Sequence, residues 1–258
     1  MSADDHTYAA ETSGRLSTRR LLADDGWAVL AATAATVTLE LAVLFLARAC
    51  TGELYAVLAA LAVGAVWIAL ACPVLAAGGK TWLSAMLRGG IVADASAVML
   101  VVVWLSSPHV AFAAAVKIYC IYAASALLGI AAVSCARTTA ARYAAAVAAA
   151  VAIMLALTTP FWVGGILKAA GPEAARTIAA AAVRVNPFYS VTAAVFETAN
   201  FAWNEAPIMY TRIQQIHDYA TAAPRWYSAP AIHATLAALL AATNLLRRQE
   251  HSSGAGQA

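Results

Sequence analysis

The sequence contains little charge. Only 11% of its 258 residues are Asp, Glu, Lys or Arg, 63% are hydrophobic, and the mean hydropathy is +0.74. Soluble domains carry about 25% charged residues. The net charge of +3 is too small to indicate nucleic-acid binding. These shortages exclude an ordinary soluble domain and a nucleic-acid-binding protein, and they predict an integral membrane protein.

The sequence also lacks the patterns of metal sites and hydrolases. Its four cysteines, Cys50, Cys72, Cys120 and Cys135, lie in or beside apolar segments without metal-ligand spacing. There is no HExxH, no GxSxG and no pair of glutamates at helical spacing. We therefore expect no metal, no cofactor and no enzymatic activity.

One short stretch, Gly78-Gly-Lys-Thr81, resembles the second half of a phosphate-binding loop. The earlier glycine of that motif is missing, because position 74 is Val, and no strand precedes the stretch. We therefore predict that the chain binds no nucleotide.

Long hydrophobic runs dominate the rest. Residues 110–168 read as two apolar helices joined by a basic turn that contains Arg137 and Arg142. At about 1.5 Å per residue, each arm can cross a hydrocarbon core of roughly 30 Å. This hairpin supplies spans 4 and 5, and spans 1 to 3 are predicted at about 27–47, 54–76 and 90–105.

The predicted fold is an all-α membrane bundle of six transmembrane helices, with short broken outer helices between spans 5 and 6. Residues 1–26 are a cytoplasmic leader, either an interfacial helix or a plain basic flank. Spans 1–5 occupy residues 27–168, an outer helical segment residues 169–230, span 6 residues 231–246, and a cytoplasmic tail residues 247–258.

The distribution of basic residues sets the orientation. Segments assigned to the inside carry Arg15, Arg19, Arg20, Lys80, Arg88, Arg137, Arg142, Arg247 and Arg248, whereas short outside segments carry Arg48 and His109. Basic short loops stay in the cytoplasm. The chain is therefore predicted to be a multi-pass protein of the cell (inner) membrane with both termini cytoplasmic.

The outer segment shows helix signals of its own. Pro172 and Glu173 are typical of a helix start, and the proline of Asn186-Pro187 restricts the residue before it. The pattern predicts one helix that ends before Asn186 and a second helix over Phe188 to Ala202. Because aromatic residues crowd this region, we expect it to dip into or lie along the outer membrane surface.

Two ionisable residues lie inside predicted spans. Glu40 in span 1 and Lys117 in span 4 fall at nearly the same depth by helical rise. Because an isolated charge at that depth is costly, we expect an ion pair between them. Three interpretations stay open: a polar lining or gate, a structural lock, and no pairing, with Lys117 snorkelling to the surface.

Three features together resemble a known family. They are the small-residue helix with its basic turn from Tyr122 to Ala141, the run Val185-Asn-Pro-Phe-Tyr-Ser190, and the plan of a basic leader, short outer turns and broken outer helices before span 6. This combination resembles the six-span permease subunits of ABC transporters of the ABC-2 exporter type.

The resemblance implies a separate cytoplasmic ATP-binding cassette subunit, a second permease copy or a related permease, and a translocation path within the lipid bilayer. It places an ATPase-docking loop at Lys80, Trp82 and Arg88, and an outer re-entrant segment at Asn186, Pro187, Phe188 and Tyr189. The chain departs from the family in one place: the Glu-Arg and Gly-Thr-Leu run of the docking helix is absent from residues 73–90.

Two other functions stay open. The missing docking run favours a non-catalytic assembly or anchoring subunit of another membrane complex. A membrane enzyme acting on a lipid would depend on the acid–base groups His217, Asp218, Glu197 and Glu205.

Overall fold

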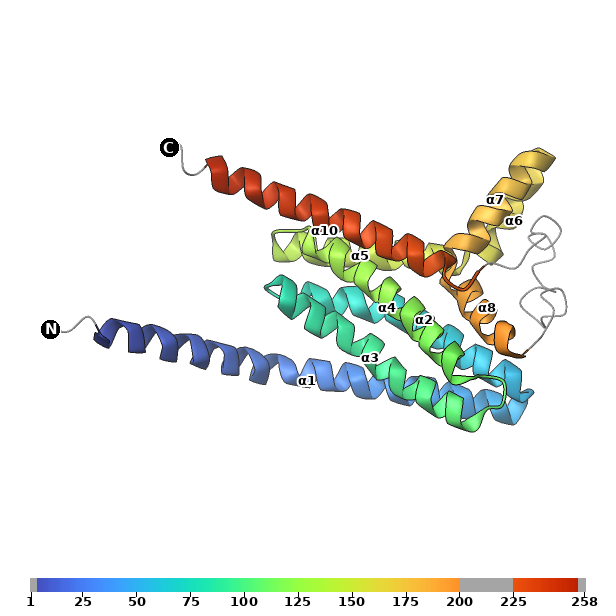
Figure 1. Ribbon diagram of the computed structural model, residues 1–258, viewed down its shortest axis with the longest axis horizontal. Helices are drawn as coiled ribbons and strands as arrows, with labels where there is room; N and C mark the ends of the chain where they lie inside the picture. The colour runs from blue at the N-terminus through green and yellow to red at the C-terminus, as the bar shows by residue number, and fades with distance from the viewer. Residues whose placement is uncertain (1–3, 200–224, 255–258) are drawn as a thin grey trace.

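In the computed structural model the protein is described over residues 4–199 and 225–254, and its side chains over residues 26–197 and 225–247. This part of the chain is all-α (Figure 1). The helices are α1 (Asp4–Cys50), α2 (Glu53–Ala77), α3 (Trp82–Ser106), α4 (Phe112–Ser134), α5 (Thr139–Leu157), α6 (Thr159–Ala169), α7 (Pro172–Val185), α8 (Pro187–Ala199) and α10 (Ser228–Gly254).

Six of these helices contain stretches that are long and apolar enough to cross a membrane. The stretches are Gly26–Cys50, Glu53–Ala77, Trp82–Ser106, Phe112–Ser134, Thr139–Leu157 and Ser228–Arg247. The prediction of a six-span all-α bundle is confirmed. The two ends of the chain lie at the same end of the bundle as the α2–α3 and α4–α5 turns (Figure 1).

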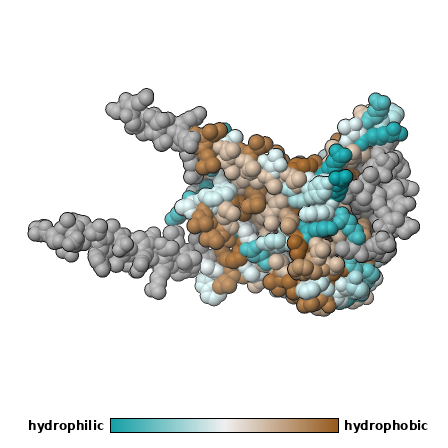
Figure 2. Space-filling model, in the orientation of Figure 1, coloured by the Kyte–Doolittle hydropathy of each residue, from teal (hydrophilic) through white to brown (hydrophobic). Residues whose placement is uncertain are grey.

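The sides of the bundle carry hydrophobic side chains. Leu46, Val147, Val151 and Leu239 are among the apolar residues more than half exposed. Hydrophobic colour extends along the bundle, and hydrophilic residues gather toward the end that carries α7 and α8 (Figure 2). A surface of this kind is stable against lipid tails and not against water, so the lipid bilayer is the environment of these helices.

Helix α2 forms the centre of the bundle and packs against α1, α3, α4 and α5. Two glycines let neighbouring helices approach closely. A Cβ atom on Gly129 of α4 would lie 2.7 Å from Cγ of Pro73 in α2, and one on Gly89 of α3 would lie 3.0 Å from the carbonyl oxygen of Cys72. The small-residue pattern in span 4 is therefore a packing feature, as expected where close backbone contact holds membrane helices together.

Two boundaries differ from the sequence prediction. Helix α3 begins at Trp82 rather than near residue 90, because the Thr81 side chain caps it by accepting the N–H of Ser84 at 3.1 Å. Helix α5 ends at Leu157, well before Lys168. Pro160 has no N–H to continue the helical ladder, and α6 starts as a new helix with this proline in its first turn.

The segment after span 5 is built from three helices. Helices α6 and α7 contact each other and leave the bundle as a hairpin, and α8 returns across its end (Figure 1). The axes of α7 and α8 differ by 76° across the break at Asn186. The predicted broken helices between spans 5 and 6 are thus present, and residues 200–224 lie outside the described part of the chain.

Candidate functional site

A buried polar cluster joins four spans near the middle of the bundle. Glu40 of α1 is 1% exposed, and Oε1 of its carboxyl group accepts the hydroxyl proton of Ser96 in α3 at 2.7 Å. Tyr122 of α4 is also buried, and its hydroxyl donates to the carbonyl oxygen of Leu61 in α2 at 2.6 Å. Hydrogen bonding reduces the cost of burying these groups in an apolar bundle.

Gly64 of α2 makes room for this cluster. A Cβ atom at position 64 would lie 2.8 Å from Oε1 of Glu40 and 2.9 Å from the hydroxyl oxygen of Tyr122. The glycine therefore lets two large polar side chains occupy the space between α1, α2 and α4.

Lys117 has a different partner from the one the sequence suggested. Its ammonium group pairs with the carboxylate of Glu197 in α8, and it lies 5.6 Å from the ring centroid of Trp226. In place of the predicted Glu40–Lys117 pair, Glu40 bonds to Ser96 and Lys117 pairs with Glu197. Equal depth did not bring the two together, because Glu40 faces α3 whereas α8 brings a carboxylate to Lys117 from outside the spans.

The Asn186-Pro187 motif is a buried joint between three helices. The Asn186 side-chain oxygen accepts the N–H of Phe188 at 2.8 Å and that of Tyr189 at 3.4 Å, which caps α8. Its amide nitrogen donates to the carbonyl oxygen of Leu157 at the end of α5, 3.1 Å away. Pro187 is the first residue of α8, where its missing N–H leaves no hydrogen bond unmade.

The same stretch holds the start of the last span. Phe188 and Tyr189 are buried in the main hydrophobic core. The hydroxyl oxygen of Ser190 accepts the N–H of Ala229 in the first turn of α10 at 3.3 Å. The stretch that the resemblance assigned to an outer re-entrant segment therefore connects α5, α8 and α10.

The predicted docking loop is the short connection between α2 and α3. Lys80 and Trp82 are exposed there. Arg88 lies in the second turn of α3, where its guanidinium group packs against Gly78: a Cβ atom on Gly78 would lie 2.1 Å from Nη1 of Arg88. The structure therefore brings Lys80 and Trp82 to one exposed surface and directs Arg88 back against the loop.

The glycines of this loop have a structural role. A Cβ atom on Gly79 would lie 2.5 Å from the backbone nitrogen of Ala85 in α3. The Gly-Gly pair thus lets the chain turn tightly against the first turns of the next helix. This packing explains the half-motif Gly78-Gly-Lys-Thr81 without a nucleotide.

Two polar contacts inside the spans involve partners that sequence reasoning did not identify. His233 of α10 is buried, with Nδ1 3.0 Å from the hydroxyl oxygen of Ser125 in α4. The hydroxyl group of Tyr119 donates to Oδ1 of Asp94 at 2.7 Å. Each of these polar residues lies within an apolar span, which can be read from the sequence. A polar group there is expected to have a hydrogen-bond partner, although the sequence does not say which.

The acid–base groups considered for an enzyme are not gathered by the described structure. Glu197 is the partner of Lys117, and His217, Asp218 and Glu205 lie outside the described residues. Within residues 26–197 and 225–247, no three His, Cys, Asp or Glu side chains converge as metal ligands.

Comparison of the chain with models of protein families, with curated proteins and with solved structures finds no match.

Proposed function

We propose that the chain is the permease subunit of an ABC-2-type exporter, which forms a membrane translocation path and is driven by a separate cytoplasmic ATP-binding subunit. In this proposal the chain performs no catalytic step. A second permease, identical or related, completes the path.

The observation that carries the proposal is the joint at Asn186. Six spans with a broken helix pair between the fifth and sixth form the plan that the resemblance implies. The Asn-Pro-Phe-Tyr run, its most specific sequence feature, lies at the break of that pair. Asn186 of this run bonds to α5, and Ser190, the residue that follows the run, bonds to α10. Motif and architecture therefore coincide at one place in the molecule.

The α2–α3 connection supports a contact with a partner at the end of the bundle that holds both chain termini. Lys80 is exposed on this connection, and Trp82, Leu83 and Leu87 are exposed on the first two turns of α3 beside it. A cation beside aromatic and aliphatic side chains suits a protein interface with an apolar centre and a charged rim.

A specific observation favours the second candidate, an assembly or anchoring subunit. Helix α3 runs without interruption from Trp82 to Ser106, so the connection contains no separate docking helix. The partner in that case is another membrane complex without an ATPase.

Affinity purification of the tagged protein from its native membrane in mild detergent, followed by mass spectrometry, tests the proposal. We expect an ATP-binding cassette protein in stoichiometric amount, lost in the variant Trp82→Ala. Trp162→Ala is the matched control, because Trp162 is similarly exposed but lies on α6 at the opposite end. Recovery of a membrane assembly without an ATPase would overturn the proposal in favour of the second candidate.

A further inference from the structure

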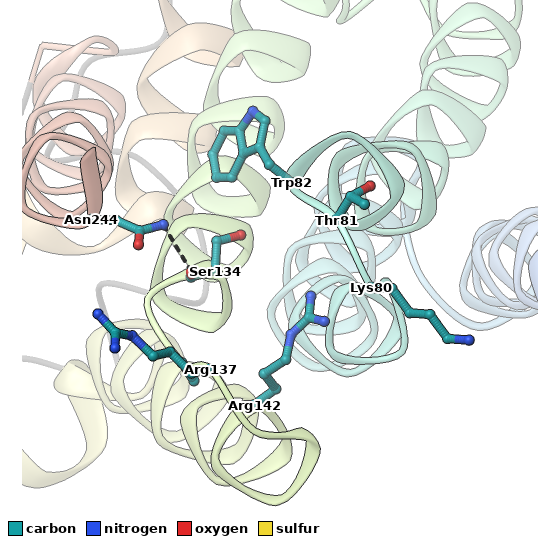
Figure 3. A pocket seen from close by; sticks show the side chains of 8 residues that line it. Lys80, Thr81, Trp82, Ser134, Arg137, Arg142 and Asn244 are labelled. Carbon is teal, nitrogen blue, oxygen red and sulfur yellow. Dashed lines mark hydrogen bonds between the residues drawn. The ribbon is translucent and has the colours of Figure 1, made fainter. Parts of the chain in front are cut away.

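A basic pocket lies at the end of the bundle where α3 and α5 begin. It has a volume of about 240 Å³ and is bounded by the α2–α3 connection, the end of α4, the start of α5 and the side of α10 (Figure 3). Its charged and polar side chains come from Lys80, Thr81, Ser134, Arg137, Arg142 and Asn244. Three of its lining residues are cations and none is acidic, so the pocket has a positive potential.

Two helix starts add to this potential. Helix α3 begins beside Thr81, and α5 begins beside Thr138. Each threonine hydroxyl accepts one N–H of the first turn, from Ser84 and Ala141 respectively, and leaves the other N–H groups of that turn without helical partners. Both helix dipoles therefore have their positive ends at this pocket.

Among the residues that the structure describes, Arg142 is the cation of this pocket that has a buried donor without an acceptor. Its Nε atom is buried and has no hydrogen-bond partner in the described part of the chain. One terminal nitrogen reaches the carbonyl oxygen of Ala76 at a long 3.4 Å. The guanidinium group lies between the α2–α3 connection and Ser134, with Lys80 and Arg137 on either side (Figure 3). A buried donor without an acceptor is costly, and an anion in the pocket would supply one.

The surroundings favour an anion that belongs to a lipid. The pocket lies at the ends of the four spans α2, α3, α4 and α5, which is the level of the phosphates of a bilayer. Beside it on α3, Leu83 and Leu87 are 65% and 64% exposed, and Trp82 presents an indole of the kind that favours the interface. Asn244 closes the wall by donating to the carbonyl oxygen of Ser134 at 2.9 Å.

We propose that this pocket binds the phosphate group of an anionic phospholipid. The lipid phosphate accepts hydrogen bonds from Arg142 and the first turns of α3 and α5, Lys80 and Arg137 neutralise its charge, and its acyl chains lie along Leu83 and Leu87. Basic pockets between membrane helices bind anionic headgroups by this chemistry. The proposal is independent of the transport function, although Lys80 and Trp82 belong to both surfaces.

Native mass spectrometry of the full chain in detergent tests the proposal. The protein is titrated with phosphatidylglycerol, with phosphatidylcholine, and with phosphatidylglycerol in the presence of millimolar inorganic phosphate. We expect one tightly bound phosphatidylglycerol that inorganic phosphate does not displace, and weaker binding of phosphatidylcholine. Arg142→Gln should weaken phosphatidylglycerol binding about fivefold, and neutralisation of all three cations on the order of a hundredfold.

Arg176→Gln is the matched control, because Arg176 is exposed on α7 far from the pocket, and it should bind as the unchanged protein does. If the triple variant fails to fold, the single variant Lys80→Gln tests the proposal. Lys80 is exposed, so this substitution removes one charge without disturbing the fold, and it should weaken phosphatidylglycerol binding. Equal binding of the two lipids, or unchanged binding in Arg142→Gln, would overturn the proposal. Displacement by inorganic phosphate would assign the pocket to a free anion instead.

A partner protein's acidic side chain is the competing occupant. In that case Arg142→Gln would abolish recovery of the ATP-binding subunit and leave phosphatidylglycerol binding unchanged, and the lipid assignment would be wrong. Loss of lipid binding with normal recovery of the partner supports it. The two proposals can therefore fail separately.

Discussion

The side-chain amide of Asn186 donates to the carbonyl oxygen of Leu157, so the residue that caps the start of α8 also completes the end of α5. Both groups are buried where the fifth span stops. A carbonyl left free by the helix break would otherwise face an apolar bundle.

Replacing Asn186 tests this joint. Asn186→Ala removes the cap of α8 and leaves the Leu157 carbonyl without its donor, and we expect a loss of about 2–4 kcal/mol of folding free energy. Asn186→Ser keeps a capping oxygen and should lose less. Thermal melting of the detergent-solubilised protein should give a decreasing melting temperature in the order Asn, Ser, Ala at position 186. Equal melting temperatures of the three proteins would show that the joint does not contribute to stability.

Gly64 should not tolerate a side chain. Gly64→Ala places a methyl group within 3 Å of Glu40 and Tyr122, and overpacking of this kind costs about 1–3 kcal/mol. Gly90→Ala is the control, because Gly90 also lies within a helix but has no atom within 4 Å of an added Cβ; it should be neutral or stabilising. Adding Tyr122→Phe to Gly64→Ala removes one of the two close contacts and should restore part of the loss.

Charge reversal distinguishes the observed partner of Lys117 from the predicted one. Lys117→Glu and Glu197→Lys should each lower the melting temperature, and the double variant should recover it, with a coupling of about 0.5–1 kcal/mol because both side chains are partly exposed. Lys117→Glu combined with Glu40→Lys should show no recovery. Recovery in that second pair would restore the Glu40–Lys117 hypothesis.

Cysteine labelling checks the orientation. With exposed Cys50 and Cys120 and half-buried Cys135 replaced by serine and buried Cys72 kept, single cysteines are introduced at Ala111 and Thr139, which are exposed at opposite ends of α4 and α5. A membrane-impermeant maleimide should label Ala111→Cys in intact cells and Thr139→Cys only after permeabilisation. The reverse pattern would place both termini outside.

Much of the architecture was predictable because hydropathy and helix length report directly on membrane spans. The helices α7 and α8 were predictable too, since Pro172 and Asn186-Pro187 carry local signals for a start and a break. The end of α5 was not: Pro160 lies within an apolar run, and hydropathy does not distinguish a helix that continues from one that stops and leaves the bundle.

The polar contacts were less predictable for a geometrical reason. Helical rise gives the depth of a residue in the membrane but not its direction around the helix axis. Glu40 and Lys117 share a depth, yet Ser96 and Glu197 are their partners. Glu197 lies in α8, which returns to the bundle after the α6–α7 hairpin. The position of α8 beside α4 depends on the whole fold, so no local sequence pattern predicts that Glu197 meets Lys117.

The joint around Asn186 also has a consequence for biosynthesis. The ribosome synthesises α5 before α8, and α10 after it. The cap of α8, Asn186, bonds to Leu157 of α5, and Ser190 of α8 bonds to Ala229 of α10. A nascent chain in which residue 229 has not yet been synthesised therefore lacks one of the two contacts that hold α8 in place. Chains arrested before residue 229 should therefore leave α8 incompletely packed. Membrane quality-control proteases should degrade them faster than the full-length protein.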